Sequence, residues 1–168
     1  MQKISISTNK YLAKILVCLI FISLLLVPNK SYAEVAETQI NGGLINASTE
    51  FLRDLDYETW QLVAYKSSTN DAKLVLRIIG YPGNLRIDHP LPLNVESGRK
   101  KWQLDDITLL NTELAEDNRQ AAAEFDLENL LQDISQNRPL RLSLQGVFSE
   151  LPVPPFLVKE WRALRTES

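Results

Sequence analysis

Apolar and polar residues alternate along most of the chain after Tyr57, with the period of two that is typical of β-strands. Trp60, Leu62 and Ala64 share one face of the first such segment. The same alternation recurs in five later segments: 73–79, 85–89, 91–95, 102–109 and 140–144. Because one face of each segment is apolar and the other is polar or mixed, the pattern predicts a mainly antiparallel sheet.

Proline and glycine mark the expected turns between these strands. Residues 81–84 (Tyr-Pro-Gly-Asn) form a tight-turn sequence, because proline fixes φ and glycine tolerates the positive φ that follows. The polar stretch 67–72 predicts another turn. Pro90 and Pro92 have no backbone N–H to donate to a neighbouring strand, so we expect 91–95 to be an edge strand.

The hydrophobic period changes after Asn111. Residues 113–125, with three consecutive alanines, favour a helix by propensity. Asp126 is a suitable N-cap for a second helix, in which apolar residues recur at helical spacing from Leu127. The proline-rich stretch 151–155 predicts an extended link into a short C-terminal helix. Together these elements predict an α+β fold: a mainly antiparallel five- to six-stranded sheet with two or three helices packed on one side.

The N-terminus has the three features of a secretory signal peptide. Lys3, Lys10 and Lys14 are followed by an unbroken run of 13 apolar or small residues at 15–27, and small residues precede an expected cleavage site after Ala33. An uncleaved membrane anchor is the alternative, but a spanning helix needs about 20 apolar residues. The sequence therefore predicts an exported protein with no membrane span after cleavage.

The chain accordingly divides into three expected parts. Residues 1–33 are the predicted signal peptide. Residues 34–50 are mostly small or polar, with two adjacent glycines, and we expect them to be a flexible lead-in. Residues 51–168 are expected to form a single α+β domain.

Composition and charge narrow the function classes. Of the 168 residues, 45% are hydrophobic and 23% are charged, as in ordinary globular proteins. The first 33 residues hold four lysines and no acidic residue, so their removal lowers the formal net charge from −3 to −7. This balance argues against nucleic-acid binding and against charge-driven binding to anionic lipid. Cys18 is the only cysteine and lies inside the signal peptide, which leaves the mature chain without disulfide or thiolate chemistry.

His89 is the one candidate for a catalytic base, because the chain has no other histidine. Paired with Asp88 or Asp54, it could activate Ser97 or Ser143. No serine lies in a G-x-S-x-G sequence, however. The alternative is a histidine at a strand end that hydrogen-bonds a backbone carbonyl. We therefore assign no catalytic residue beyond His89 as a weak candidate.

Metal and cofactor sites have little support in the sequence. Asp54, Asp56 and Glu58 have the alternate spacing of calcium ligands, but the stretch lacks the glycine of such a loop and runs directly into a strand. Solvated acidic residues ahead of a strand are the simpler interpretation. We expect no metal and no cofactor.

Two segments are candidates for contact with a partner. Arg99, Lys100 and Lys101 form the one cationic cluster of an acidic protein, and could dock on an acidic partner or on lipid headgroups; a hairpin tip kept soluble by charge is the alternative. Phe156 and Trp161 follow the proline-rich stretch, whose rigidity would hold these large aromatic side chains in a preordered docking surface. Closure of the core is the alternative for Trp161, and we also expect Trp60 and Trp102 in the core.

Several stretches resemble an uncharacterised family of small secreted cyanobacterial proteins, a domain of unknown function. The similar stretches are 52–65 (LRDLDYETWQLVAY), 76–93 (LRIIGYPGNLRIDHPLPL), 125–144 (FDLENLLQDISQNRPLRLSL) and 151–165 (LPVPPFLVKEWRALR). The resemblance covers nearly all of the mature domain. No activity is attached to these motifs, so the resemblance implies a location, the periplasm or the thylakoid lumen, and no chemistry.

We therefore consider three functions. The first is an exported non-catalytic accessory or interaction protein, with an unknown protein partner beside a membrane assembly. The second is a small-ligand-binding module, which would need an apolar pocket of a few hundred Å³ between sheet and helices. The third is a hydrolase that uses His89.

Overall fold

The computed structural model describes residues 36–40, 43–67, 73–81, 87–116 and 121–166. The predicted signal peptide lies outside these ranges, as do most of the residues of the predicted turns at 67–72 and 81–84. Within the described residues, no helix is long and apolar enough to cross a membrane.

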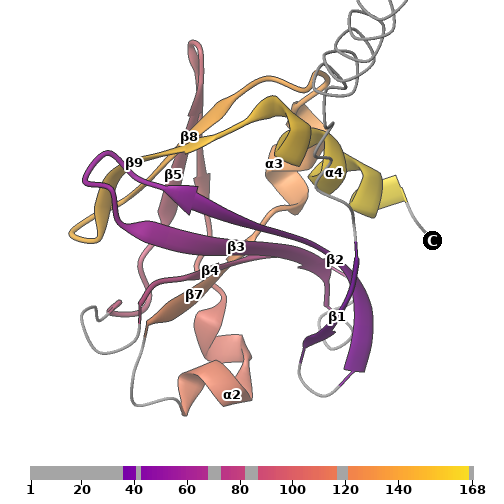
Figure 1. Cartoon of the computed structure of the whole chain (residues 1–168), viewed down its shortest axis with the longest axis vertical. Helices are drawn as coiled ribbons and strands as arrows, with labels where there is room; N and C mark the ends of the chain where they lie inside the picture. The colour runs from indigo at the N-terminus through magenta and orange to yellow at the C-terminus, as the bar shows by residue number, and fades with distance from the viewer. Residues whose placement is uncertain (1–35, 41–42, 68–72, 82–86, 117–120, 167–168) are drawn as a thin grey trace, which may run out of the picture. The chain divides into compact units, whose positions relative to one another are not determined.

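The strands of the described part form two antiparallel sheets, one of five strands and one of four (Figure 1). The first sheet has the order β1-β2-β3-β4-β7, in which β1 adds a fifth strand at the edge. It comprises β1 (Ala36–Ile40), β2 (Gly43–Arg53), β3 (Thr59–Lys66), β4 (Leu74–Ile79) and β7 (Ala122–Asp126). The second sheet has the order β6-β5-β8-β9. It comprises β5 (Leu93–Ser97), β6 (Lys100–Leu104), β8 (Leu140–Leu144) and β9 (Phe148–Val153).

Short helices connect or cover the strands. They are the 3-10 helix η1 (Thr108–Leu110), α2 (Thr112–Ala115), α3 (Glu128–Asp133) and α4 (Pro155–Thr166). The side chain of Asn111 accepts hydrogen bonds from the first N–H groups of α2, and Asp126 accepts one from the N–H of Glu128 at the start of α3. Each carboxyl or amide oxygen satisfies N–H groups that have no partner inside the helix.

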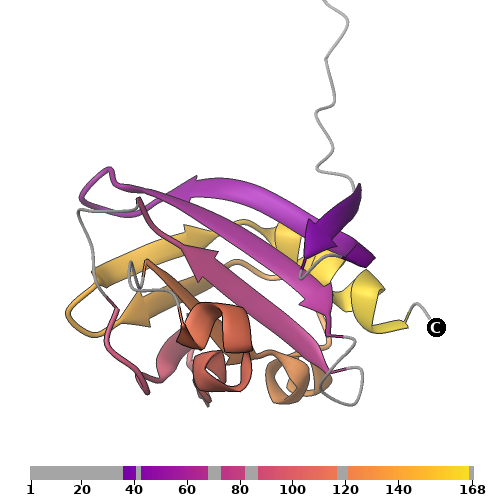
Figure 2. The same cartoon turned by 90° about the horizontal axis from the view of Figure 1, so that it is seen from below.

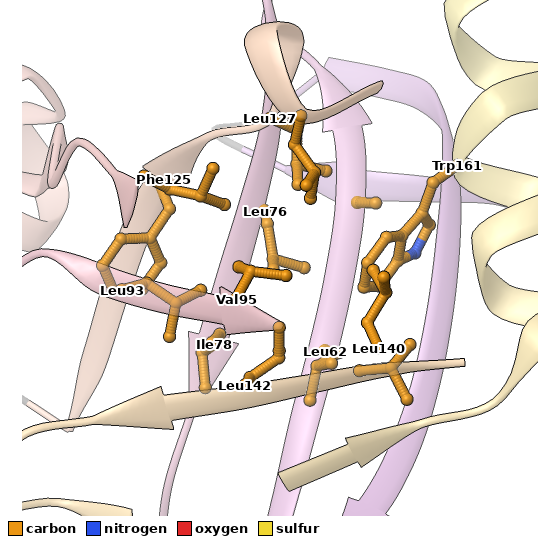
Figure 3. Close-up of a cluster of buried hydrophobic side chains, with 14 of the residues drawn as sticks. Leu62, Leu76, Ile78, Leu93, Val95, Phe125, Leu127, Leu140, Leu142 and Trp161 are labelled. Atoms are coloured by element: carbon orange, nitrogen blue, oxygen red, sulfur yellow. The ribbon is translucent and has the colours of Figure 1, made fainter. Parts of the chain in front are cut away.

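The hydrophobic core lies between the two sheets, and α3 and α4 cover one end of it. Figure 2 shows β2, β3 and β4 in one layer and β8 and β9 in another. In Figure 3, side chains from both layers point toward one another: Leu62, Leu76 and Ile78 from the first sheet, Leu93, Val95, Leu140 and Leu142 from the second. Trp161 of α4 packs at the end of this cluster and is fully buried.

Backbone hydrogen bonds join the two sheets at two places. On one side, the N–H of Ile107 donates to the carbonyl of Glu124, so the chain that continues β6 pairs with β7. On the other side, the N–H of Leu55, just after β2, donates to the carbonyl of Glu150 in β9. These links satisfy backbone groups that an open sheet edge would leave unpaired.

The α+β class and the antiparallel pairing agree with the sequence analysis, but the single sheet does not. The strands divide between two sheets, and α4 packs against β2 and β3 of the first one. Alternation shows which residues of a strand face the core, but it carries no information on which strands pair.

The predicted helix over 113–125 is wrong in its C-terminal part. Among the described residues of this stretch, those in Thr112–Ala115 are helical, whereas Ala122–Asp126 is strand β7. Ala123 and Phe125 are fully buried in the core, whereas Glu124 lies on the opposite face. Pairing with β4 and burial of one face outweigh the helix propensity of alanine.

Four smaller expectations need correction. The expected flexible lead-in at 34–50 contains β1 and most of β2. β5 lies between β6 and β8 rather than at an edge, because both prolines precede its first residue, Leu93. The described residues of the predicted strand 85–89 are not in a strand. The predicted link 151–155 is extended, but its first three residues belong to β9.

Candidate functional site

A groove of about 490 Å³ lies between the tip of the β5–β6 hairpin and the chain that follows α3. Two segments that are far apart in the sequence therefore form its walls. The groove is lined by Ser97, Gly98, Arg99, Lys100, Trp102, Asp133, Ile134, Ser135, Gln136 and Arg138. Among the described residues, it is the place where the cations of the hairpin lie beside an aromatic side chain.

The hairpin that forms one wall is held by its turn and by one long-range hydrogen bond. Gly98 has a φ of +60°, a conformation that side chains with a Cβ rarely adopt, and Ser97 pairs with Lys100 across the turn. The hydroxyl of Ser97 donates to the carbonyl of Pro139 at 3.0 Å. This bond ties the hairpin to the segment that leads into β8.

Trp102 and Lys100 share one carboxylate in the groove. The indole Nε1 of Trp102 donates to Oδ2 of Asp133 at 2.8 Å, and the Nζ of Lys100 lies 3.3 Å from the same oxygen. Lys100 also lies 5.8 Å from the centroid of the indole ring, within the range of a cation–π contact. The hydrogen bond from Trp102, followed by that from Lys100, holds the pKa of Asp133 below its usual value, so Asp133 is ionised at neutral pH.

The predicted cationic triplet divides between two environments. Arg99 and Lys100 line the groove, whereas Lys101 lies outside it and pairs with Glu96, with 2.5 Å between Nζ and Oε1. The pairing with Lys101 lowers the pKa of Glu96. The sequence analysis missed Arg138, whose Nε donates to Oε1 of Gln136 at 2.9 Å on the opposite wall.

Trp102 was expected in the core, and it is only partly there. Its side chain packs against the edge of the core with one part and lines the groove with another. Trp60 is buried as expected, and it makes an edge-to-face contact with Phe148 at 5.0 Å between ring centroids. Sequence alternation placed Trp102 on the correct face of β6 but did not show that this face leaves the core at the end of the strand.

The two candidates of the C-terminal segment also differ in environment. Trp161 is fully buried among core residues, which agrees with core closure and leaves no ring surface for a partner. Phe156, at the start of α4, is 45% exposed. Of this pair, only Phe156 is accessible.

His89 is paired with a residue that the sequence analysis did not assign to it. Its Nδ1 lies 2.7 Å from Oδ2 of Asp106, and both side chains are almost completely buried. Asp88 and Asp54 do not take this place; Asp54 accepts hydrogen bonds from Trp60 and from the backbone of its own turn. Ser97 donates to a carbonyl instead of contacting His89. The geometry gives no support to the hydrolase hypothesis.

Asp106 belongs to a larger buried polar cluster. Each of its two carboxylate oxygens accepts two hydrogen bonds. Oδ2 accepts from His89 and the N–H of Leu91, and Oδ1 accepts from the N–H and the hydroxyl of Thr108. Burial opposes its ionisation, but the bonds from Thr108, His89 and Leu91 outweigh it, so the pKa of Asp106 lies below its usual value. An ionised Asp106 accepts only, which means that His89 donates through its Nδ1–H.

Glu124 of β7 connects this cluster to the outer face of the first sheet. Its N–H donates to the Thr108 hydroxyl. Its carboxylate accepts from Nε of Arg77 at 2.8 Å, from the hydroxyl of Tyr65 and from Nδ2 of Asn111. Burial, with the bond to Glu124, raises the pKa of Tyr65, so Tyr65 stays a neutral donor. These groups satisfy one another and fasten η1 and α2 to the sheet; none faces one of the described cavities.

No cluster of three or more potential metal ligands occurs among the described residues. Asp54 is buried in the turn between β2 and β3, whereas Asp56 and Glu58 are exposed. The alternate spacing therefore reflects a turn that is stabilised by the Asp54 side chain.

Hollows also occur beside the β8–β9 turn and between α3 and α4, with volumes of about 440 and 250 Å³. Like the groove, both lie at the surface. The space between the sheets is occupied by fully buried side chains, where the small-ligand hypothesis required an apolar pocket.

A family model for a protein of unknown function, DUF3122, matches residues 33–164. The chain belongs to this family. The match covers every described strand and all but the last residues of α4. No curated protein and no solved structure matches the chain.

Proposed function

We propose that this DUF3122 protein is an exported, non-catalytic interaction protein that binds an acidic segment of a partner protein through the groove between the β5–β6 hairpin and the chain after α3. The periplasm or the thylakoid lumen is the proposed compartment. The basic residues, apolar run and small residues at 1–33 support export, and the family match begins at residue 33.

The observation that carries the proposal is that Arg99, Lys100 and Arg138 line the same groove as Trp102, with the Nζ of Lys100 5.8 Å from the centroid of its ring. Arginine binds carboxylates through a planar pair of N–H donors, and tryptophan supplies a large rigid contact surface. The predicted mature chain is strongly acidic, so this local positive patch differs in sign from its surroundings. Such a patch favours acidic partners over other surfaces and fixes their orientation.

The contact surface is tested with two double variants of equal charge change. Arg99→Gln/Arg138→Gln removes two cations of the groove; Lys101→Gln/Lys159→Gln removes two cations that do not line it. Partners are crosslinked in the host, captured with each tagged variant and quantified against the unchanged protein. We expect the groove variant to lose at least about 90% of its partner, because each charge-assisted hydrogen bond contributes about 1.5–3 kcal/mol. We expect the control to retain it.

Equal losses in the two double variants would contradict a contact through the groove. Export is tested separately: fractionation of the host and mass spectrometry of the purified protein should show a chain that begins after Ala33 outside the cytosol. A cytosolic chain with an intact leader would contradict the proposed location.

A further inference from the structure

The groove already contains a carboxylate of its own. Asp133, at the C-terminal end of α3, accepts from the indole of Trp102 and pairs with Lys100 through the same oxygen, Oδ2. Trp102 and Lys100 are therefore the two donors in the groove that already hold a carboxylate. The carboxylate of Asp133 is thus held by one N–H donor and one ammonium group, and the ammonium also lies near the indole ring.

The other two cations of the groove differ from Lys100. Among the described residues, no carboxylate pairs with Arg99 or Arg138. Arg99 is exposed at the hairpin turn, and Arg138 donates a hydrogen bond to the neutral amide of Gln136. The groove therefore combines one occupied carboxylate position with two guanidinium groups that a ligand can reach.

The internal pair is suited to exchange. More than half of the side-chain surface of both Lys100 and Asp133 is exposed. An exposed ion pair of this kind contributes about 0–1 kcal/mol, so its replacement by an equivalent external pair costs little. Asp133 nevertheless remains charged at neutral pH, since its pKa is lowered, and it reduces the positive potential that a ligand meets.

We infer that Asp133 is a built-in competitor of the acidic ligand, which takes the place of the Asp133 carboxylate at Lys100 and Trp102 when it binds. This inference rests on the proposed function and adds its regulation. The ligand is a peptide segment with several neighbouring Glu or Asp residues. One carboxylate displaces Asp133, and those next to it bind Arg99 and Arg138. Asp133 thereby disfavours ligands that carry one carboxylate and favours segments that carry several carboxylates.

The test uses the purified protein and a defined probe, a hexaglutamate peptide, with hexaglutamine as the uncharged control. Binding is followed by tryptophan fluorescence, because Trp102 lines the groove while Trp60 and Trp161 are buried. Asp133→Asn keeps an oxygen that can accept from Trp102 but removes the competing charge. We expect it to bind hexaglutamate about two- to fivefold more tightly, the range that corresponds to one exposed ion pair.

Two controls separate competition from a general charge effect. Glu113→Gln removes one exposed negative charge on α2, outside the groove, and we expect it to change affinity less than Asp133→Asn. In a Lys100→Gln background, Asp133→Asn should give a clearly smaller gain, because the ion pair with Lys100 is already absent and only the competition at Trp102 and the general effect of the charge remain. A gain of the same size in both backgrounds would overturn the inference.

The outcomes also separate this inference from the proposed function. If Asp133→Asn binds no more tightly than Glu113→Gln while Arg99→Gln/Arg138→Gln still weakens binding, the competitor role is wrong and the groove remains the site. If hexaglutamate does not bind at all, both are wrong. Binding of phosphatidylglycerol vesicles in place of the peptide would overturn both as well, because the occupant would then be a lipid surface.

Discussion

The Nδ1 of His89 lies 2.7 Å from Oδ2 of Asp106, and this buried pair joins the chain just before β5 to the chain just after β6. The two strands form the hairpin whose tip is one wall of the groove. The same carboxylate oxygen accepts from the N–H of Leu91. The one histidine of the chain therefore fixes the base of the hairpin through Asp106.

Asp106→Asn should lower the free energy of unfolding by about 1–3 kcal/mol, because an amide has one acceptor oxygen where the carboxylate has two, and a buried N–H donor is left without a partner. Urea denaturation of the two proteins measures the difference. An unchanged stability would show that the four donors around Asp106 find other partners.

The stabilisation from Asp106 should also depend on pH in a defined direction. Its pKa in the folded protein lies below the value of 3.8 expected for the unfolded chain, so folding favours the ionised form. The contribution is complete above pH 3.8 and is lost as the pH falls through the lowered pKa of the folded state. The difference in free energy of unfolding between wild type and Asp106→Asn should shrink in this acid range and stay constant around neutral pH. A gap that widens in acid would contradict the assignment.

Glu124→Gln should cost more than the loss of an ordinary hydrogen bond. Glu124 is 3% exposed, and its carboxylate is the charged partner of Arg77 at 2.7 Å. Removing one charge of a buried pair typically costs about 3–5 kcal/mol, because the other charge stays in a poorly solvated place. Asn111→Ala, which removes the cap of α2 and a neutral donor to Glu124, should cost only about 1 kcal/mol. Equal losses in urea denaturation would rule out an energetic role for the charge.

Trp161 and Phe156 should respond very differently to truncation, although both are aromatic residues of α4. Trp161→Ala opens a cavity in the core and should lower stability by about 3–5 kcal/mol. Phe156→Ala removes a side chain that is 45% exposed and should change stability by less than about 1 kcal/mol. Thermal and urea unfolding of the two variants checks the assignment of Trp161 to the core.

The sequence predicted those elements whose hydrophobic period is regular over their whole length. β3, β8, α3 and α4 lie where alternation or helical spacing placed them. β7 was missed, because alanine favours helices by itself and its strand conformation depends on β4, which lies far away in the sequence. The division into two sheets likewise depends on strand pairing, which alternation does not report.

The groove was predictable only in part for the same reason. Arg99 and Lys100 could be identified because they belong to a run of like charges, which is visible in the local sequence. Trp102 and Asp133 are 31 residues apart, and nothing in either segment indicates that the two side chains meet. Asp106 lies 17 residues from His89, beyond the neighbours that a local search considers. Long-range contacts of this kind require the fold.

Gly98→Ala and Gly146→Ala provide a matched test of the groove. Both glycines lie in hairpin turns with positive φ, +60° and +74°, and a Cβ at either position would meet no atom within 4 Å. Each substitution should therefore lower stability by a similar amount, about 1–2 kcal/mol of backbone strain. Gly98 lines the groove beside Arg99, whereas Gly146 lies in the β8–β9 turn outside it.

If the β5–β6 turn positions Arg99 and Lys100 for an acidic ligand, Gly98→Ala should weaken hexaglutamate binding severalfold while Gly146→Ala leaves it unchanged. Comparing the two at equal loss of stability removes the general effect of a weakened fold. Because φ at Gly98 sets the direction in which the next two side chains leave the turn, a change in φ that relaxes the strain would alter the positions of both cations in the groove. Equal binding by both variants, measured by tryptophan fluorescence at matched folded fractions, would mean that the hairpin tip does not contribute to the site.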